Sequence, residues 1–278
     1  MQNPEQSSSV AMRYLHAFQG LLLRDLYVLR RELFPFIIRI CMNPLLFLFV
    51  FTYIMPHMTG GTNPTTAMAS SSGGFGTVIL PGLMAVAIMF SGIAAVALPL
   101  AQEFGITREI DDRVMCPLPV SFVALEKVFF SAMQSVLAAA VVFPLAYYIP
   151  TEPVKVHVTS WLFLIAVIAL ASLTAGALGL VIGTSVRPQQ IGLIFGVVIM
   201  PITFLGCVYY PWAALNHLRW LQIFVLINPI VYMSEGLRAA LTPSLPSMHH
   251  LAILIMLTVS LIVLGYVGIR GFKRRVIG

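Results

Sequence analysis

The chain has 278 residues, of which 59% are hydrophobic and 9% are charged, and its mean hydropathy is +0.94. Soluble domains are usually only ~45 to 50% apolar, so this composition excludes a soluble protein and predicts a membrane protein. The formal net charge of +6 indicates orientation in the membrane and contact with anionic lipid, and nucleic acid is not expected as a partner.

The N-terminal segment, residues 12–34, predicts an amphipathic helix that lies along the cytoplasmic face of the membrane. Large apolar residues recur at steps of three and four: Leu15, Phe18, Leu22, Leu26, Leu29 and Leu33. Arg13, Arg24 and Arg31 fall on the opposite face of the same helix. The alternative, an additional span, would place several charges in lipid at high cost. The sequence MQNPEQSSS also lacks the pattern of a signal peptide, so the first span is expected to remain in the mature chain.

Long uncharged runs predict six membrane-spanning helices, because one span needs ~20 apolar residues. They cover residues 36–56, 77–101, 121–148, 159–184, 190–210 and 250–270. An even number of spans places both termini on one side of the membrane. All lysines and arginines except Lys155, Arg219 and Arg238 are then on that side. Since basic residues are retained in the cytoplasm, both termini are predicted to be cytoplasmic.

The segment after the second predicted span, residues 103–119, concentrates charge. Its first part, EFGITREIDDR, has six charged residues in eleven positions, apolar residues between them, and a following CPLP. This pattern predicts a short amphipathic helix that ends at the prolines and docks on a soluble partner. The alternative is a passive, solvated loop. The candidate docking charges are Glu103, Arg108, Glu109, Asp111, Asp112 and Arg113.

Residues 211–243 predict a re-entrant helical hairpin, because the apolar run within them is too short for an ordinary span. Asn228 is a good helix cap and Pro229 suits the first helical position, so the turn is expected near Asn228. Glu235 and Arg238 are three residues apart on the second helix. They are expected to pair on one face of it.

The sequence predicts no catalytic or metal site. The six histidines lie at or next to loops without metal-ligand spacing, the three cysteines form no CxxC motif, and there is no P-loop for ATP. An ion-coupled carrier or channel, which is the alternative class, would normally have carboxylates inside its spans, and these spans have almost none. The energy source is therefore expected in another chain.

The order of these elements resembles the permease subunits of ATP-binding-cassette exporters of the ABC-2 type, over essentially the whole chain. The stretch EFGITREIDDRVMCPLP is similar to the family's E-x-G-T-x-E loop and the following P-[LIV]-x run. NPIVYMSEGLRAAL and PGLMAVAIMFSGI are also similar to family stretches. The sequence departs from the family at Ile106, which separates Gly105 from Thr107 where relatives often have Gly-Thr directly.

The resemblance implies one ABC-2 type transmembrane domain over residues 1–278, all-α, in the plasma (inner) membrane of a bacterium. It implies no enzyme activity and no cofactor in this chain, since ATP and Mg²⁺ would be bound by a separate P-loop ATPase subunit. It also implies pairing with a second permease, either an identical copy or a related chain. The residues that match the family's coupling segment are Glu103, Gly105, Thr107 and Glu109, and those that match its exit-side hairpin are Asn228, Pro229, Tyr232, Glu235 and Arg238.

The transported substrate is not specified by any motif. Uncharged, methionine-rich spans favour a bulky amphiphile such as a drug or a lipid, because methionine adapts to irregular shapes. Export of a polysaccharide or glycolipid is the alternative, and four aromatic residues near the exit side fit it: Tyr209, Tyr210, Trp212 and Trp220. An interfacial aromatic belt would contain the same residues.

Overall fold

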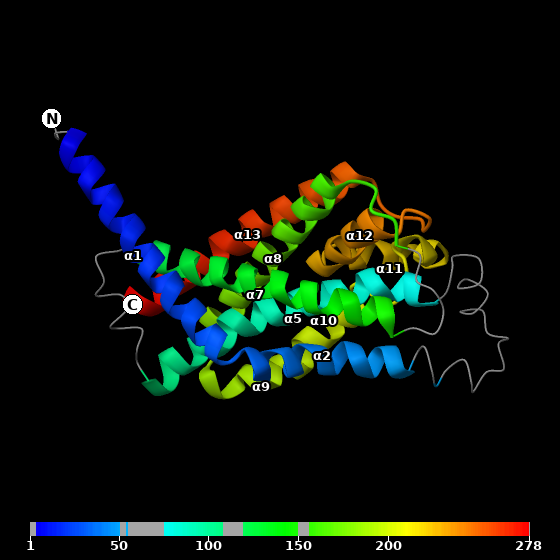
Figure 1. Ribbon diagram of the computed structural model, residues 1–278, viewed down its shortest axis with the longest axis horizontal. Coiled ribbons are helices and arrows are strands. Elements are labelled where there is room, and N and C mark those ends of the chain that lie inside the picture. Colours follow the sequence, from blue (N-terminus) through cyan, green and yellow to red (C-terminus); the bar gives the residue numbers. More distant parts are fainter. Residues whose placement is uncertain (1–3, 51–53, 55–74, 108–118, 150–155, 278) are drawn as a thin grey trace.

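The computed structural model describes residues 4–50, 54, 75–107, 119–149 and 156–277. Within these ranges all regular secondary structure is helical, which confirms the all-α prediction. The longer helices are α1 (Pro4–Arg31), α2 (Leu33–Phe49), α5 (Phe75–Gln102), α7 (Val120–Tyr148), α8 (Trp161–Ser185), α12 (Pro229–Leu241) and α13 (His250–Ile277). Figure 1 shows α2, α5, α7, α8 and α13 running along the length of the molecule as a bundle.

Helix α5 forms the centre of this bundle. It packs against α7, α8 and α12. In its most apolar stretch of 18 residues 78% is buried, compared with 17% in the corresponding stretch of α13. A helix that is apolar on every side and surrounded by other helices has no large lipid-facing surface. The predicted second span is therefore the core helix of the protein.

Small residues allow α5, α7 and α8 to approach one another closely. Ser131 of α7 donates a hydrogen bond from Oγ to the carbonyl oxygen of Gly92 at 2.9 Å, and Ser135 donates one to Ile88 at 3.0 Å. A Cβ atom on Gly176 of α8 would lie only 2.8 Å from Ser131 Oγ. In membrane proteins, where lipid is as apolar as leucine, such close contacts and interhelical hydrogen bonds hold helices together.

Four helices are long and apolar enough to cross a membrane: α5, α7, α8 and α13. They match four of the six predicted spans. The bent pair α11 (Arg219–Val225) and α12 is a fifth candidate. The predicted spans 36–56 and 190–210 each overlap a shorter apolar helix, Leu33–Phe47 and Ile191–Phe204, and residues 51–53 and 55–56 of the first lie outside the described residues. The described residues thus give four or five candidate spans, and the count of six stays a prediction.

The helix that covers most of the predicted fifth span, Ile191–Phe204, has a π-helical turn in its middle. It follows η3 (Pro188–Gln190) and consists of α9 (Ile191–Ile194), the π-helical turn η4 (Phe195–Ile199) and α10 (Met200–Phe204). A turn follows, in which Cys207 has a φ of 52°, a backbone conformation that non-glycine residues rarely adopt. η5 (Trp212–His217) then leads into α11. The predicted boundary at residue 210 is therefore six residues beyond the end of the helix.

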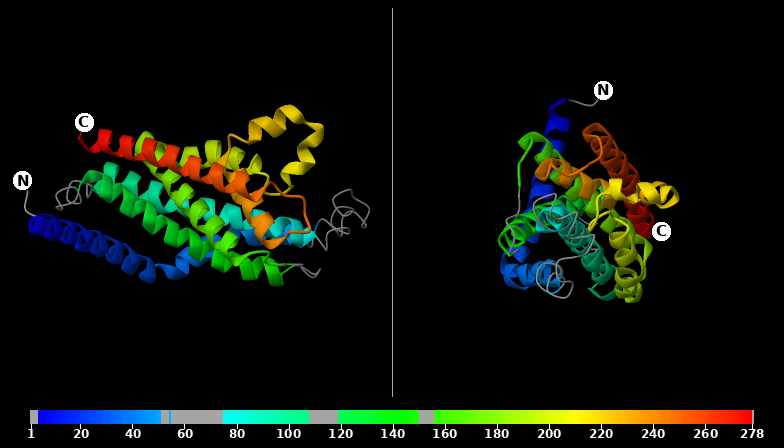
Figure 2. Two further views of the ribbon diagram at one scale, coloured as in Figure 1. Left: turned by 90° about the horizontal axis from the view of Figure 1, so that it is seen from above. Right: turned by 90° about the vertical axis from the view of Figure 1, so that its right-hand side faces the viewer.

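Both ends of the chain are at the same end of the bundle, as Figures 1 and 2 show for the start of α1 and the end of α13. The placement of both termini on the cytoplasmic side of the membrane stays a prediction. The apolar face predicted for residues 12–34 is partly used within the protein: Leu29 is buried, and Leu22 and Leu26 pack on the main core. Leu15 remains 57% exposed.

Candidate functional site

The predicted coupling segment begins as a direct continuation of α5. After Gln102 the helix widens into the π-helical turn η2 (Glu103–Thr107). Pro99 lies one turn earlier inside α5, and because proline has no backbone N–H, it loosens the hydrogen bonding of the helix near this end. Gly105 is exposed within η2. The remaining candidate docking residues, Arg108, Glu109, Asp111, Asp112 and Arg113, lie outside the described residues, as does the rest of the predicted 103–119 helix.

Glu103 is buried in the protein, although the sequence placed it among the docking charges. Lys127 of α7 donates a hydrogen bond from Nζ to Glu103 Oε1 at 2.8 Å, and their side chains are only 6% and 5% exposed. Taking one of these charges away would leave the other in a poorly solvated position. The ion pair therefore ties the end of α5 to α7, close to the point where the coupling segment begins.

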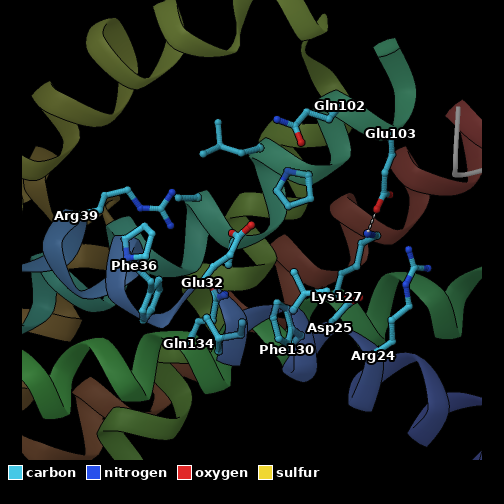
Figure 3. Close-up of a pocket in the computed structure, with 17 residues that line it drawn as sticks. Arg24, Asp25, Glu32, Phe36, Arg39, Gln102, Glu103, Lys127, Phe130 and Gln134 are labelled. Atoms are coloured by element: carbon cyan, nitrogen blue, oxygen red, sulfur yellow. Dashed lines mark hydrogen bonds and ion pairs between the residues drawn. The ribbon is translucent and has the colours of Figure 1, made fainter. Parts of the chain in front are cut away.

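A pocket of about 550 Å³ adjoins this ion pair (Figure 3). It is bounded by α1, α2, α5 and α7. Six charged residues line it, three of each sign: Arg24, Arg39, Lys127, Asp25, Glu32 and Glu103. Apolar residues complete the wall, among them Leu98 and Phe130. The pocket is therefore amphipathic and electrically balanced.

Helix α5 forms one wall of the pocket, and its residues there are more exposed than those on the rest of the helix. Between Gly76 and Gln102, every residue is buried except Phe90 and five others. These five all line the pocket: Ala94, Ala95, Leu98, Pro99 and Gln102. Their spacing of three and four residues places them on one helical face. The pocket thus exposes one stripe of the most buried helix.

Arg275, near the end of α13, makes a contact that the sequence did not predict. Its Nη1 lies within hydrogen-bond distance of the carbonyl oxygens of Gly183, Thr184 and Val186, at 3.0, 3.1 and 2.8 Å. These carbonyls are at the end of α8, where no backbone partner is available within the helix. The guanidinium also lies 4.6 Å from the ring centroid of Phe104 in η2. In the sequence, Arg275 was one of several basic residues near the C-terminus.

The segment predicted to be the exit-side hairpin has its turn and helix cap at Asn228. Asn228 Oδ1 accepts a hydrogen bond from the N–H of Ile230 at 3.1 Å, and Pro229 is the first residue of α12. Asn228 Nδ2 also donates to the carbonyl oxygen of Ile202 at 2.6 Å. Helices α11 and α12 meet here at 95°. The predicted turn and cap are confirmed, and Tyr232 adds a hydrogen bond from its hydroxyl to Leu226 at 2.8 Å.

Glu235 and Arg238 form the predicted ion pair, and both side chains are completely buried. Glu235 also accepts hydrogen bonds from the backbone N–H groups of Trp212, at 2.9 Å, and Met248, at 3.3 Å. Arg238 donates from Nη2 to the carbonyl oxygen of Cys207 at 3.1 Å. The pair therefore joins α12 to the turn before η5, to η5 itself and to the approach to α13. Sequence spacing indicated the pair but none of these long-range contacts.

The two constellations lie toward opposite ends of the bundle, since η2 and α12 are far apart in Figure 1. In the described part of the chain, no three side chains of His, Cys, Asp or Glu are grouped so that they could hold a metal ion. The features combine a membrane-embedded helical bundle, an amphipathic pocket and two buried ion pairs. They describe a polytopic helical membrane protein, whose named residues position helices and line a pocket.

The family model for the ABC-2 type transporter matches residues 16–242. This range is more than half of the chain, and the chain belongs to that family. It is a transmembrane permease subunit of an ABC transporter, whose ATPase is a separate subunit. No curated protein matches the chain.

Proposed function

We propose that this permease exports an amphiphilic molecule such as a drug or a lipid across the bacterial inner membrane. ATP hydrolysis in a separate ATPase subunit would drive export through contact with residues 103–119. Two permeases, identical or related, would enclose the path between them. Family membership leaves the direction and the substrate of transport open. Outward transport is proposed from the resemblance to exporters, and the substrate class is proposed from the geometry of this chain.

The continuity of α5 with η2 is the observation that carries the coupling proposal. A force applied at residues 103–119 acts directly on the central helix of the bundle, and the Glu103–Lys127 pair transmits it to α7. Arg275 connects the same segment to α8 through Phe104. Packed helices move as rigid bodies, so a displacement of η2 would shift several helices together.

The amphipathic pocket supports an amphiphile as substrate. The four aromatic residues that would favour a polysaccharide are largely used in packing. The Tyr209 ring packs at a tilt against Phe47 and Phe204, at centroid distances of 5.1 and 5.7 Å. Trp212 donates from Nε1 to the carbonyl oxygen of Gln222 at 3.4 Å. Of the four, only Trp220 is strongly exposed, at 69%. An aromatic track for sugar rings would need several exposed faces.

The test is charge reversal at Glu109→Arg with Asp112→Arg, in a permease co-expressed with its P-loop ATPase subunit. Glu103 is left unchanged, since reversing a buried charge next to Lys127 would disturb packing. The double variant should insert at the parental level, lose the ATPase on purification and stop exporting, because truncated or reversed charge contacts can cost ~2 to 5 kcal/mol. The matched control is Arg219→Glu, which reverses an exposed charge at the start of α11. This variant should still co-purify with the ATPase and export the substrate. Parental co-purification and transport by the double variant would refute the coupling proposal.

A further inference from the structure

We propose that the pocket between α1, α2, α5 and α7 binds the head group of a zwitterionic amphiphile, with its phosphate at Arg39 and its primary ammonium at Glu32 and Gln134. This inference names the substrate class for the export activity, and it rests on the proposed function only in treating the bound molecule as the transported one. Three observations from the described part of the chain carry it: two charged side chains with no hydrogen-bond or ion-pair partner, a buried amide oxygen with no hydrogen-bond partner, and an apolar wall beside them.

Glu32 and Arg39 offer opposite charges to the same space. They flank Phe36 at steps of four and three residues, and Figure 3 shows their side chains on either side of its ring. Neither side chain makes a hydrogen bond or an ion pair with another residue in the described part of the chain. The Arg39 guanidinium lies 6.0 Å from the Phe36 ring, which holds it by a cation–π contact. A guanidinium in this state suits a phosphate, and a carboxylate suits an ammonium group.

Gln134 supplies a second and independent sign of a ligand. Its side chain is only 8% exposed, it lines the same pocket from α7, and its buried Oε1 has no hydrogen-bond partner within the residues described. Leaving a buried amide oxygen unsatisfied is costly, and most such atoms have a partner. A ligand that donates an N–H hydrogen bond would satisfy it, which favours a primary ammonium over a quaternary one.

The balance of charge argues for a ligand that carries both signs. A purely anionic head group would meet the Glu32 carboxylate, and a purely cationic one would meet the Arg39 guanidinium. Like charges brought together in a partly dry pocket repel, whereas complementary ones are favoured. Ala94, Ala95 and Leu98 of α5 give an apolar surface for the beginning of the tail. A volume of about 550 Å³ is in the range of small-ligand sites, so it accommodates a head group and not long chains.

Binding of a short-chain lysophosphatidylethanolamine to the purified permease, without ATPase or ATP, tests the inference. Calorimetry should show that the permease binds this lipid at least about tenfold more tightly than a phosphoglycerol lipid or an alkylammonium with the same tail. A difference of about tenfold in affinity is what one charged hydrogen bond contributes. Free phosphoethanolamine should bind far more weakly. Equal affinity for the three amphiphiles, or tight binding of the tail-less compound, would overturn the proposal.

The variants Glu32→Gln, Arg39→Gln and Gln134→Leu should each weaken binding by about tenfold. Gln134→Leu keeps the side-chain volume and removes an unsatisfied group, so the protein should fold at least as well. Arg31→Gln is the control, because Arg31 is an exposed neighbouring charge that does not line the pocket. Unchanged affinity in all three pocket variants would overturn the proposal. If the permease binds this lipid but does not export it with ATP, only the proposed function is contradicted. If it exports another amphiphile and does not bind this lipid, only the head-group assignment is contradicted.

Discussion

Gly82 of α5 lies against the backbone of Val208 so closely that a Cβ atom at this position would overlap the Val208 carbonyl group. Val208 follows Cys207, whose carbonyl oxygen accepts from Arg238. The central helix and the Glu235–Arg238 ion pair are therefore joined through one short turn. Gly82, the first glycine of the stretch PGLMAVAIMFSGI, is needed for this contact between segments that are far apart in the sequence.

Replacement of this glycine, Gly82→Ala, should destabilise the permease. The added methyl group meets backbone atoms, which cannot move aside as the end of a flexible side chain can, and overpacking of this kind typically costs ~1 to 3 kcal/mol. The thermal unfolding midpoint in detergent should fall measurably. Gly265→Ala in α13 is the matched control, because no atom lies within 4 Å of its added methyl group. Equal midpoints for the two variants would show that the Val208 contact is not tight.

Removal of the buried carboxylate in Glu235→Ala should reduce stability by ~3 to 5 kcal/mol, because it leaves the Arg238 cation buried without its partner. The double variant Glu235→Leu with Arg238→Met should recover much of this loss, since it removes both charges. Yield of monodisperse protein and resistance to thermal unfolding are the measurements. If Glu235→Ala is as stable as the parent protein, the Glu235–Arg238 pair is solvated rather than buried.

The Glu103–Lys127 ion pair should behave as a structural contact between α5 and α7. Lys127→Met is expected to lower stability, whereas the exchange Glu103→Lys with Lys127→Glu should restore part of it, because opposite charges again meet within the same buried space. Unfolding midpoints of both variants, measured without the ATPase, provide the check. Were Lys127→Met to retain parental stability and lose only ATPase binding, Glu103 would act as a docking charge.

The side of the membrane on which each end of the bundle lies can be measured by cysteine labelling in intact cells. Single cysteines introduced by Ser244→Cys and Lys273→Cys are both at exposed positions, in a background with Cys41 and Cys116 replaced by serine. Cys207 is buried and should not react. An impermeant thiol reagent should modify the cysteine of Ser244→Cys and not that of Lys273→Cys, because basic residues mark the cytoplasmic side. Labelling of Lys273→Cys in intact cells would contradict the predicted topology.

The sequence by itself determined the class of the protein and the features that depend on neighbouring residues. Apolar runs of sufficient length predicted α5, α7, α8 and α13, because span length is set by bilayer thickness. The Asn228 cap and the Glu235–Arg238 pair also followed from spacing, since a cap acts over two or three residues and positions i and i+3 share a helical face. The family resemblance of the named stretches is confirmed by the match over residues 16–242.

The tertiary structure decided which charges are buried and which residues form the pocket. Glu103 has the same sequence signature as the other charges of EFGITREIDDR, yet it lies inside the bundle because Lys127, which is 24 positions away, provides its partner there. Likewise, Arg275 caps α8 across about ninety residues of chain, and Gln134 faces a pocket formed mainly by other helices. Helical periodicity indicates which residues share a face, and only the packing of the helices against one another determines what that face meets.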